Sequence, residues 1–516
     1  MLLFKLFVSF YGLAKEAFNF KSIQHHIARS DLLKILVRYL TVLLTLLLLS
    51  TYILVVPFIL IRCILHVILL IKHGKNFGGF LKGFSALFEA QREKSTIVTV
   101  FTIENTNKDE FVEKLKLITE NLHKCNYMFS SVIKSFFGYK YFLKNQIEPE
   151  QILTNVTLNS KNAITRNDLL EYLEGYKIIK DGKLWEIVVF DQPLMVAENK
   201  PNELVVMIRV NHSVTDAYFM IALYRKYLLD PVKTEQKEIN LRQPKRAFSL
   251  DDLFLNTNPL NPGIEQFLFH GSENQFISTF LEHEAKYVRK IKKIKDCLDV
   301  GFTDVLLAAL VKSVSDFLEK KLGKCGKDVV IHLTTRGRSD DMVNIVNGTF
   351  DTNELSNEFA LLQFVAPTAT KRTSAIDYLR SVNKSCINAK SSIDILLFYL
   401  IPKVTCQFFP TFINKFGCDL MLRNVCIMNT NMSAVDGGTI GNKKITSVFA
   451  YTSLHFNQGM MLNTVTFRNN IQACLVGRVE FLKNRDDIDT ILKNMFVFID
   501  ELENELFERN KRNGMK

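Results

Sequence analysis

Tryptophan is almost absent from this sequence, and the common motifs for metals and nucleotides are missing. The chain of 516 residues has a single tryptophan, and its nine cysteines form no CxxC pair and no Cys/His group of zinc-site spacing. A Walker A loop, a GxGxxG turn after a strand and an HExxH helix are also missing, so NTPases, nicotinamide enzymes and zinc hydrolases have no support. We expect reduced, mostly structural thiols facing the cytosol, no metal site and no permanently bound cofactor.

Disordered and low-complexity character is absent as well. With 47% hydrophobic and 23% charged residues, the composition is that of a folded protein, and the length suggests about three domains. Acidic residues are in deficit, with 53 Asp and Glu against 65 Lys and Arg, a net charge of +12. This balance favours an anionic partner such as a membrane surface, a nucleotide-bearing cofactor or nucleic acid. No nucleic-acid-binding module is recognisable, so we expect no nucleic-acid partner.

A long apolar run is present near the N-terminus. From Tyr39 to Ile71 the only formally charged side chain is Arg62, a pattern typical of a membrane segment. We assign residues 39–72 to this segment. One helix near Tyr39–Ile61 would span the bilayer, but Pro57 and Arg62 break the run, and the segment is also long enough for a shallow hairpin. Residues 1–38 form an N-terminal segment that suits either an amphipathic interfacial helix or a core-packing helix. Basic residues on both sides are compatible with two cytosolic flanks.

The pattern changes to that of a soluble α/β protein at about residue 95. Apolar, β-rich runs such as STIVTVFTI, ELVVMIRV and DVVIHLTT alternate with helix-like stretches such as FTDVLLAALVKSVSDFLEKKL. This alternation predicts mixed sheets covered by helices. We expect one lobe at residues 95–230 and a second at 301–510. Between them, residues 231–300 hold a polar linker and the basic run Lys286–Asp296, which suits a solvated helix face or a dock for cofactor phosphates or lipid head groups.

The most informative histidine follows a strand-like run. Leu204–Val210 leads to Asn211-His212-Ser213-Val214-Thr215-Asp216, and an apolar helix pattern follows. A side chain at such a turn can face a cleft while the scaffold holds it rigid. Asp216 can buttress the turn or fix the imidazole. The pattern His26–Asp31 is an HxxxxD like that of glycerophosphate-type acyltransferases, but no FPEG-like block follows it, and we take it as a coincidence.

The blocks around the HxxxD turn resemble the wax ester synthase/diacylglycerol acyltransferase family of bacteria and plants. That family lies within the superfamily of CoA-dependent acyltransferases that includes chloramphenicol acetyltransferase. The resemblance covers roughly residues 95–510, and the family's HHxxxDG motif falls on Asn211, His212, Asp216 and Ala217. The first His is therefore Asn here, and the Gly is Ala. The other family blocks fall, in chain order, on Lys183-Leu184-Trp185 (PLW), Thr303-Asp304 (ND), Arg336 (the family's Arg), Leu355-Ser356-Asn357 (LGN) and a degenerate Thr430-Asn431-Met432 (SNVPGP).

This resemblance implies an α/β (α+β) fold of two chloramphenicol-acetyltransferase-like lobes with mixed sheets, beside the N-terminal membrane helix or hairpin. It implies transfer of a fatty acyl group from acyl-CoA, the co-substrate, to a long-chain alcohol or diacylglycerol, giving wax ester or triacylglycerol. His212 would be the general base and Asp216 the second catalytic residue. The supporting residues implied are Asn211, Trp185, Asp304, Arg336, Asn357 and Asn431.

The partners implied are acyl-CoA, a lipophilic alcohol or diacylglycerol, and membrane lipids. The implied location is the endoplasmic reticulum membrane, with the catalytic part facing the cytosol. The departures at Asn211 and Ala217 support an alternative, a catalytically silent lipid-binding or scaffolding protein of the same fold.

Several supporting residues also have a structural interpretation. Trp185 fits core packing on an apolar strand, and Thr303-Asp304 fits a helix N-cap. Asn431 is either a donor to the thioester oxyanion or a turn residue. Arg336 either braces Asp216 or binds a phosphate.

Overall fold

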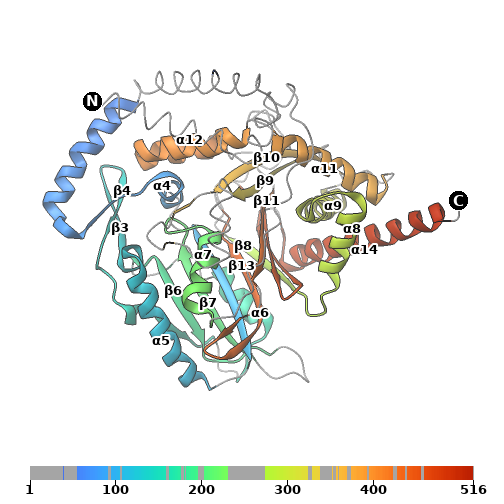
Figure 1. Cartoon of the computed structure of the whole chain (residues 1–516), viewed down its shortest axis with the longest axis horizontal. Helices are drawn as coiled ribbons and strands as arrows, with labels where there is room; N and C mark the ends of the chain where they lie inside the picture. The colour runs from blue at the N-terminus through green and yellow to red at the C-terminus, as the bar shows by residue number, and fades with distance from the viewer. Residues whose placement is uncertain are drawn as a thin grey trace.

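The structure is a computed structural model that describes residue 39 and most residues from 55 to 514 (Figure 1). The N-terminal segment 1–38 with its HxxxxD pattern, and residues 231–273 of the expected linker, lie outside the described residues. Within the span 55–514 the other residues left out are 91–94, 105–106, 159–161, 176–178, 180–181, 196–202, 323–327, 337–350, 352–355, 358, 369–372, 392–393, 422–426, 436–437, 455–457 and 481.

Two six-stranded mixed sheets form the body of the protein. The first, in spatial order, consists of β12 (Thr439–Ile440), β13 (Lys443–Thr452), β2 (Thr96–Glu104), β7 (Glu203–Asn211), β6 (Trp185–Phe190) and β5 (Leu153–Val156). The second consists of β10 (Phe359–Pro367), β9 (Asp328–Arg336), β11 (Ile427–Val435), β14 (Met460–Phe467), β15 (Asn470–Arg478) and β8 (Gln275–Leu281). A smaller antiparallel sheet consists of β1 (Phe77–Phe80), β4 (Tyr139–Leu143) and β3 (Val132–Phe136).

The strand pair β2 and β7 positions the histidine turn. Both strands are buried over almost their whole length, as expected for strands covered on both faces. They pair antiparallel from Thr96 opposite Asn211 to Glu104 opposite Glu203. At the end of this ladder the backbone N–H of His212 donates to the carbonyl oxygen of Ser95 at 2.7 Å. The turn that holds His212 is therefore fixed to a central strand.

Strand partners depart from the expected lobes in two places. β13, from the expected C-terminal lobe 301–510, pairs with β2 in the first sheet. β8, from the expected linker 231–300, is an edge strand of the second sheet and pairs with β15. Residue alternation indicates that a segment is a strand, but it does not say which distant strand supplies the hydrogen bonds. The expectation of a polar linker is therefore corrected for this strand, whereas the basic run that follows it forms the expected helix, α8 (Lys286–Leu298).

Helices cover the sheets (Figure 1). In chain order they are α4 (Gly83–Glu89), α5 (Lys108–Cys125), α6 (Arg166–Gly175), α7 (Ala217–Leu223), α8 (Lys286–Leu298), α9 (Phe302–Leu322), α11 (Ala375–Ser391), α12 (Asp394–Phe408), α13 (Thr411–Met421) and α14 (Arg485–Gly514). Short helical turns are η1 (Gly74–Asn76), η2 (Tyr127–Ser130), η3 (Pro149–Gln151) and η5 (Tyr224–Leu228).

The basic run identified in the sequence is α8, and it packs against α14. Val288, Ile291 and Ile294 are buried along one side of α8. On its polar side Lys290 pairs with Asp500 at 2.6 Å and with Glu503 at 2.8 Å. These ion pairs occupy part of the basic run with acidic side chains of the same chain.

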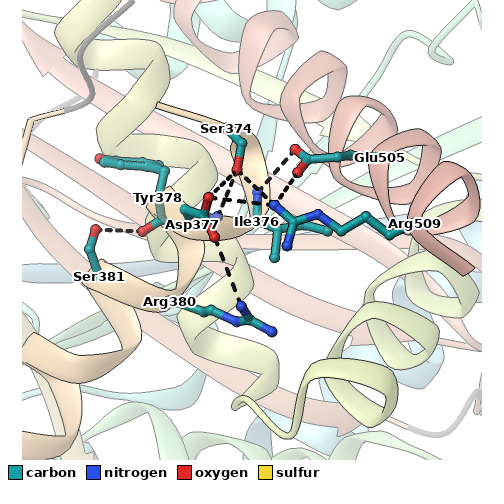
Figure 2. A network of polar contacts seen from close by, with 8 residues as sticks. All are labelled: Ser374, Ile376, Asp377, Tyr378, Arg380, Ser381, Glu505 and Arg509. Atoms are coloured by element: carbon teal, nitrogen blue, oxygen red, sulfur yellow. Dashed lines mark hydrogen bonds and ion pairs between the residues drawn. The ribbon is translucent and has the colours of Figure 1, made fainter. Parts of the chain in front are cut away.

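The start of α11 is tied to the end of α14 by a polar network (Figure 2). Ser374 caps α11 by accepting from the backbone N–H of Asp377 at 3.2 Å, and its hydroxyl donates to the Asp377 carboxylate at 2.8 Å. From α14, Glu505 accepts from the backbone N–H of Ile376 at 3.2 Å, and Arg509 donates to Ser374 at 3.1 Å. The N–H groups at the start of α11 thus have partners from both helices.

The described part of the predicted membrane segment is the helix Val55–Asn76, called the apolar helix below. Among the described residues it is the one helix long and apolar enough to cross a membrane. It runs unbroken through Pro57 and Arg62, so the expected interruption at these residues is wrong. Arg62 stays inside the helix because its guanidinium donates to the carbonyl oxygen of Leu81 at 3.1 Å and lies over the ring of Phe80. In Figure 1 the apolar helix is the blue helix at the left edge, far from the C-terminal end of α14.

Candidate active site

His212 stands at the end of β7, in the short turn before α7. Its side chain is only 9% exposed. The ring of Phe88 stacks on the imidazole with centroids 3.8 Å apart and planes inclined by 21°, and the ring of Phe359 lies 6.0 Å away. His212 comes from the first sheet, whereas Phe359 begins β10 in the second sheet. The histidine therefore lies where segments of the two sheets meet.

Asn357 sets the orientation of the imidazole. Its side-chain Nδ2 donates to the backbone oxygen of His212 at 2.7 Å and to Ser85 Oγ at 3.0 Å. These two bonds turn Oδ1 of Asn357 toward Nδ1 of His212, 3.0 Å away. Because a carbonyl oxygen only accepts, Nδ1 must carry the hydrogen, and in the neutral ring Nε2 is then the nitrogen with a lone pair.

Burial favours the neutral imidazole. It lowers the pKa of His212 to about 4, against opposing hydrogen bonds to Asn357 and to backbone groups of His212 and Thr215. At neutral pH the ring is therefore uncharged. An uncharged ring of fixed tautomer, held by an amide on a separate segment, has the chemistry required of a general base.

A third segment, α4, closes the site. Besides Phe88 and Ser85 it contributes Glu89, whose buried carboxylate accepts from Asn211 Nδ2 at 3.5 Å and from Ser213 Oγ at 3.3 Å. Lys140 of β4 lies 3.7 Å from the same carboxylate. Through Glu89, α4 is thus bonded to both chain neighbours of His212, Asn211 and Ser213.

Asp216 buttresses the turn. Its carboxylate caps α7 by accepting from the backbone N–H groups of Tyr218 at 3.0 Å and Phe219 at 3.1 Å. The side-chain partner described for the imidazole Nδ1 is Asn357. Of the two roles expected for Asp216, the structure displays that of the N-cap.

Trp185 and Asp304 lie in the cores of the two halves. Trp185 is buried, donates to the carbonyl oxygen of Phe129 at 2.9 Å, and packs edge-on to that ring, in agreement with core packing. Asp304, in the first turn of α9, accepts from Asn383 at 2.6 Å and pairs with Lys390 at 3.3 Å. Burial alone would raise the pKa of Asp304, but the charge of Lys390 and several hydrogen bonds outweigh it and lower the pKa. Both residues have structural roles in the described contacts.

Asn431 lies inside strand β11, so the expectation of a turn is wrong. Its Nδ2 donates to Thr303 Oγ1 at 3.1 Å, and its Oδ1 accepts from Thr464 Oγ1 at 3.1 Å. Both atoms of the amide are therefore engaged within the second half of the chain. Arg336 is the last residue of β9 and is paired with Phe359 of β10 in the strand register, while its side chain is outside the described residues.

A small apolar cavity lies behind the histidine turn. Its volume is about 20 Å³, and it is lined by residues of α7, β2 and β13, with Ala217, Met220 and Ile221 on the helix side. Met432 of β11 lines it from the second sheet. The volume is roughly that of one water-sized sphere.

No group of three or more His, Cys, Asp or Glu side chains able to hold a metal occurs in the part of the chain that the structure describes.

Comparison with known family models gives one match, in the C-terminal part of the chain. Residues 355–499 match the model of the WS/DGAT C-terminal domain. The chain carries a WS/DGAT C-terminal domain. The resemblance predicted from the sequence blocks is confirmed by this match and by the fold. No curated protein matches the chain significantly.

Solved structures share the fold at low identity. The wax ester synthase/diacylglycerol acyltransferase from Marinobacter aquaeolei VT8 has a TM-score of 0.55 and 12% identity, over 83% of this chain and 99% of the other. The TRI3 trichothecene 15-O-acetyltransferase from Fusarium sporotrichioides has a TM-score of 0.56 and 10% identity, over 82% and 94%. The first condensation domain of the CDA synthetase has a TM-score of 0.53 and 10% identity, over 83% and 97%. The predicted two-lobed, chloramphenicol-acetyltransferase-like α/β fold with mixed sheets is confirmed.

The WS/DGAT blocks found in the sequence reach the candidate site only in part. His212, Asn211, Asp216 and Asn357 come together, whereas the described contacts of Trp185, Asp304 and Asn431 lie elsewhere in the two halves. Sequence reasoning missed the contribution of α4, namely Ser85, Phe88 and Glu89. The available signal was the apolar stretch GFSALFEA (residues 83–90), which lies between the membrane segment and the first expected lobe and was assigned to no domain.

Proposed function

We propose that the protein is an O-acyltransferase that moves a fatty acyl group from acyl-CoA to a lipophilic alcohol or diacylglycerol at a membrane. The observation that carries the proposal is the His212–Asn357 pair, in which Asn357 Oδ1 accepts from Nδ1 and thereby selects the tautomer whose Nε2 has the lone pair. The WS/DGAT domain and the fold of the wax ester synthase/diacylglycerol acyltransferase support the same class of reaction.

In the proposed step, the substrate hydroxyl lies next to Nε2 of His212. Its oxygen attacks the thioester carbonyl carbon of acyl-CoA while its proton passes to Nε2. The C–O bond forms, the C–S bond breaks, and the CoA thiolate takes the proton back from Nε2 as it leaves. Neither a covalent acyl-enzyme nor a metal is needed to balance this transfer. General-base assistance of this kind typically contributes about 10²–10⁴-fold in rate.

The proposal requires substrates to reach a covered imidazole. Phe88 occupies one face of the ring in this structure, and the small cavity behind the turn holds roughly one water-sized sphere. An acyl or alkyl chain must therefore displace α4 side chains or widen the cavity. The flexible side chains of Met220 and Met432 are suited to such repacking.

A second candidate is supported by the same covering. If His212 stays closed beneath Phe88, the protein is a catalytically silent lipid-binding or scaffolding protein of this fold, in keeping with the Asn211 and Ala217 departures. Purified full-length protein incubated with labelled palmitoyl-CoA and a panel of fatty alcohols, diacylglycerol and sterols separates the two. Formation of labelled ester establishes the enzyme. Binding of the lipids without ester formation establishes the silent protein.

A further inference from the structure

One side of the apolar helix packs on the three-stranded sheet β1-β4-β3. Three polar contacts follow this packing from the first turns to the last: Tyr139 Oη to the carbonyl oxygen of Phe58 (3.4 Å), Arg62 Nη2 to that of Leu81 (3.1 Å), and Tyr141 Oη to His73 Nε2 (3.2 Å). At 1.5 Å per residue, the helical stretch between the first and last of these contacts is about 22 Å long. The helix therefore lies along the sheet instead of projecting from it.

Opposite sides of the apolar helix have opposite surroundings. Leu65 and Leu69 are buried among Phe77 and Phe80 and other aromatic side chains of the small sheet. The side turned away from the sheet carries Leu60, Ile64, Val67 and Ile71, all exposed and spaced by four, three and four residues. This spacing puts them in one stripe of the helix. We call these four residues the exposed stripe.

If this helix crossed a membrane, the small sheet packed on it would also lie within the bilayer. β1 and β3 are edge strands of that sheet, and Lys134 of β3 is exposed. Unpaired strand edges and a charged side chain are not tolerated against lipid chains, since hydrocarbon offers no hydrogen-bond partners. The helix can nevertheless bury the exposed stripe in lipid if its axis lies parallel to the membrane surface.

An aromatic corner extends this apolar surface at the first turns of the helix. It consists of Phe137, at the β3–β4 turn, and Phe412 and Phe416, one helical turn apart on α13, all exposed. The backbone N–H of Thr411 donates to the carbonyl oxygen of Gly138 at 2.8 Å, which joins the β-turn to the start of α13. Phe58 of the apolar helix packs edge-on to Phe409, just before α13, with centroids 4.8 Å apart. The helix, the β-turn and α13 thus meet at one place.

Lysines dominate the charges around this surface, although α13 also contains Asp419. Between Val55 and Phe88, and again between Val132 and Ile147, the sequence contains no Asp or Glu. The same stretches and α13 expose Lys72, Lys75, Lys82, Lys134 and Lys415. Exposed aliphatic and aromatic side chains flanked by lysines are the features with which interfacial helices bind anionic membranes.

We propose that the apolar helix lies flat in the surface layer of an anionic lipid bilayer, embedding the exposed stripe and the aromatic corner, and does not cross the bilayer. This membrane position rests on the proposed function, because it describes how the acyltransferase would reach lipophilic acceptors. The helix α4 starts directly after β1 of the same small sheet, and its Phe88 stacks on His212. A flat helix thus places the α4 side of the candidate site beside the leaflet in which lipophilic acceptors dissolve.

The depth of single tryptophans tests the proposal. The one natural tryptophan, Trp185, is buried, so its emission is a constant background that the wild type measures. Leu60→Trp, Val67→Trp and Ile71→Trp place a probe on one stripe at both ends and in the middle, over about 16 Å of helix axis. Each full-length variant is bound to phosphatidylcholine–phosphatidylserine vesicles whose chains are brominated either near the head group or near the chain end.

A flat helix gives all three tryptophans the same quenching profile, strongest with bromine near the head group. A crossing helix places at least one of the three near the bilayer centre, so that this probe is quenched best by bromine at the chain end, and that result overturns the proposal. Absence of quenching at all three positions also overturns it, because the stripe would then be covered by residues 1–54 or by a second copy of the chain. Phe507→Trp on α14 is the control, and it should remain unquenched.

Vesicle binding tests the aromatic corner. Phe412→Glu with Phe416→Glu should weaken binding to the same vesicles at least about tenfold, since two embedded rings are replaced by charges that anionic lipid repels. The matched control is Phe507→Glu, because Phe507 is 60% exposed, compared with 67% for Phe412 and 73% for Phe416. It should bind as the wild type does. Equal binding of the double variant and the wild type excludes the corner from the membrane surface.

The membrane proposal and the catalytic proposal can fail separately. Ester formation from palmitoyl-CoA and a short, water-soluble alcohol in detergent solution needs no bilayer. A protein that makes ester there but gives a crossing depth profile retains the proposed function and loses the flat helix. A protein that lies flat but makes no ester retains the membrane surface and loses the acyltransferase.

Discussion

Asn357 Oδ1 lies 3.0 Å from Nδ1 of His212, and the same amide donates to the backbone oxygen of that histidine. The two residues come from opposite halves of the chain, and the amide that joins them selects the tautomer of the ring. The contact is therefore both a structural joint and the condition for Nε2 to act as a base.

Asn357→Ala should lower kcat for ester formation by about 10² while changing KM little, since the ring loses the partner that fixes its tautomer. Gln363→Ala is the matched control. Gln363 lies 2.8 Å from Nε2 of another buried histidine, His332, within the second sheet. Kinetics of the two purified variants check the prediction. An equally large loss of kcat in Gln363→Ala would contradict the prediction, because it would show that damage to any buried histidine–amide pair lowers kcat.

The pH profile of kcat/KM should have its acid limb well below pH 6.5. A general base works when neutral, and burial lowers the pKa of His212 to about 4, so the fraction of active enzyme falls only as pH approaches that value. Between about pH 5.5 and 8 we expect a plateau, measured with a soluble alcohol. An acid limb at the ordinary histidine pKa would mean that the ring in the working enzyme is open to water.

Phe88→Ala should move that acid limb upward. The ring of Phe88 covers the imidazole, and its removal admits water that stabilises the protonated form. Phe84→Ala is the control on the same helix, since Phe84 packs on Phe359 with centroids 4.5 Å apart. Comparison of the two profiles checks the effect, and equal shifts in both would assign it to loosening of α4 as a whole.

Folding stability should fall as pH is lowered from about 6.5 toward 4 and be insensitive to these histidines above pH 7. Burial lowers the pKa of both His212 and His332 to about 4, so in this window the unfolded chain binds protons that the folded chain does not. The cost at the acid end is on the order of 3 kcal/mol for each histidine. Urea unfolding of the full chain at several pH values measures it.

His332→Leu should remove about half of this pH dependence, whatever its effect on absolute stability. An unchanged slope in this variant would place the proton uptake on other groups.

The sequence predicts the local structure of the His212 turn better than the contacts that the turn makes with distant segments. The strand before His212, the helix after it and the N-cap chemistry of Asp216 are local patterns, and each is found where the pattern places it. Asn357 was reached only through the resemblance to a family block, because it is distant in sequence from the histidine that it orients.

Long-range contacts account for what the sequence left out. Phe88 and Glu89 read as ordinary residues of an apolar stretch, and only the packing of α4 on the turn brings them to the site. A turn was one of two alternatives for Asn431, yet strand pairing with β14 holds it in β11. In the same way, the sequence of β13 indicates a strand but not its partner, and its pairing with β2 is decided by the folded arrangement of both halves.

The most direct test of the account is the rate at which His212→Ala forms labelled ester from palmitoyl-CoA and a long-chain alcohol, beside the wild type and His332→Ala. We expect the first variant to lose about 10²–10⁴-fold in rate with its circular dichroism spectrum unchanged, and His332→Ala to retain most of its activity. Wild-type turnover in a folded His212→Ala protein would contradict the central claim that this imidazole takes the proton from the alcohol.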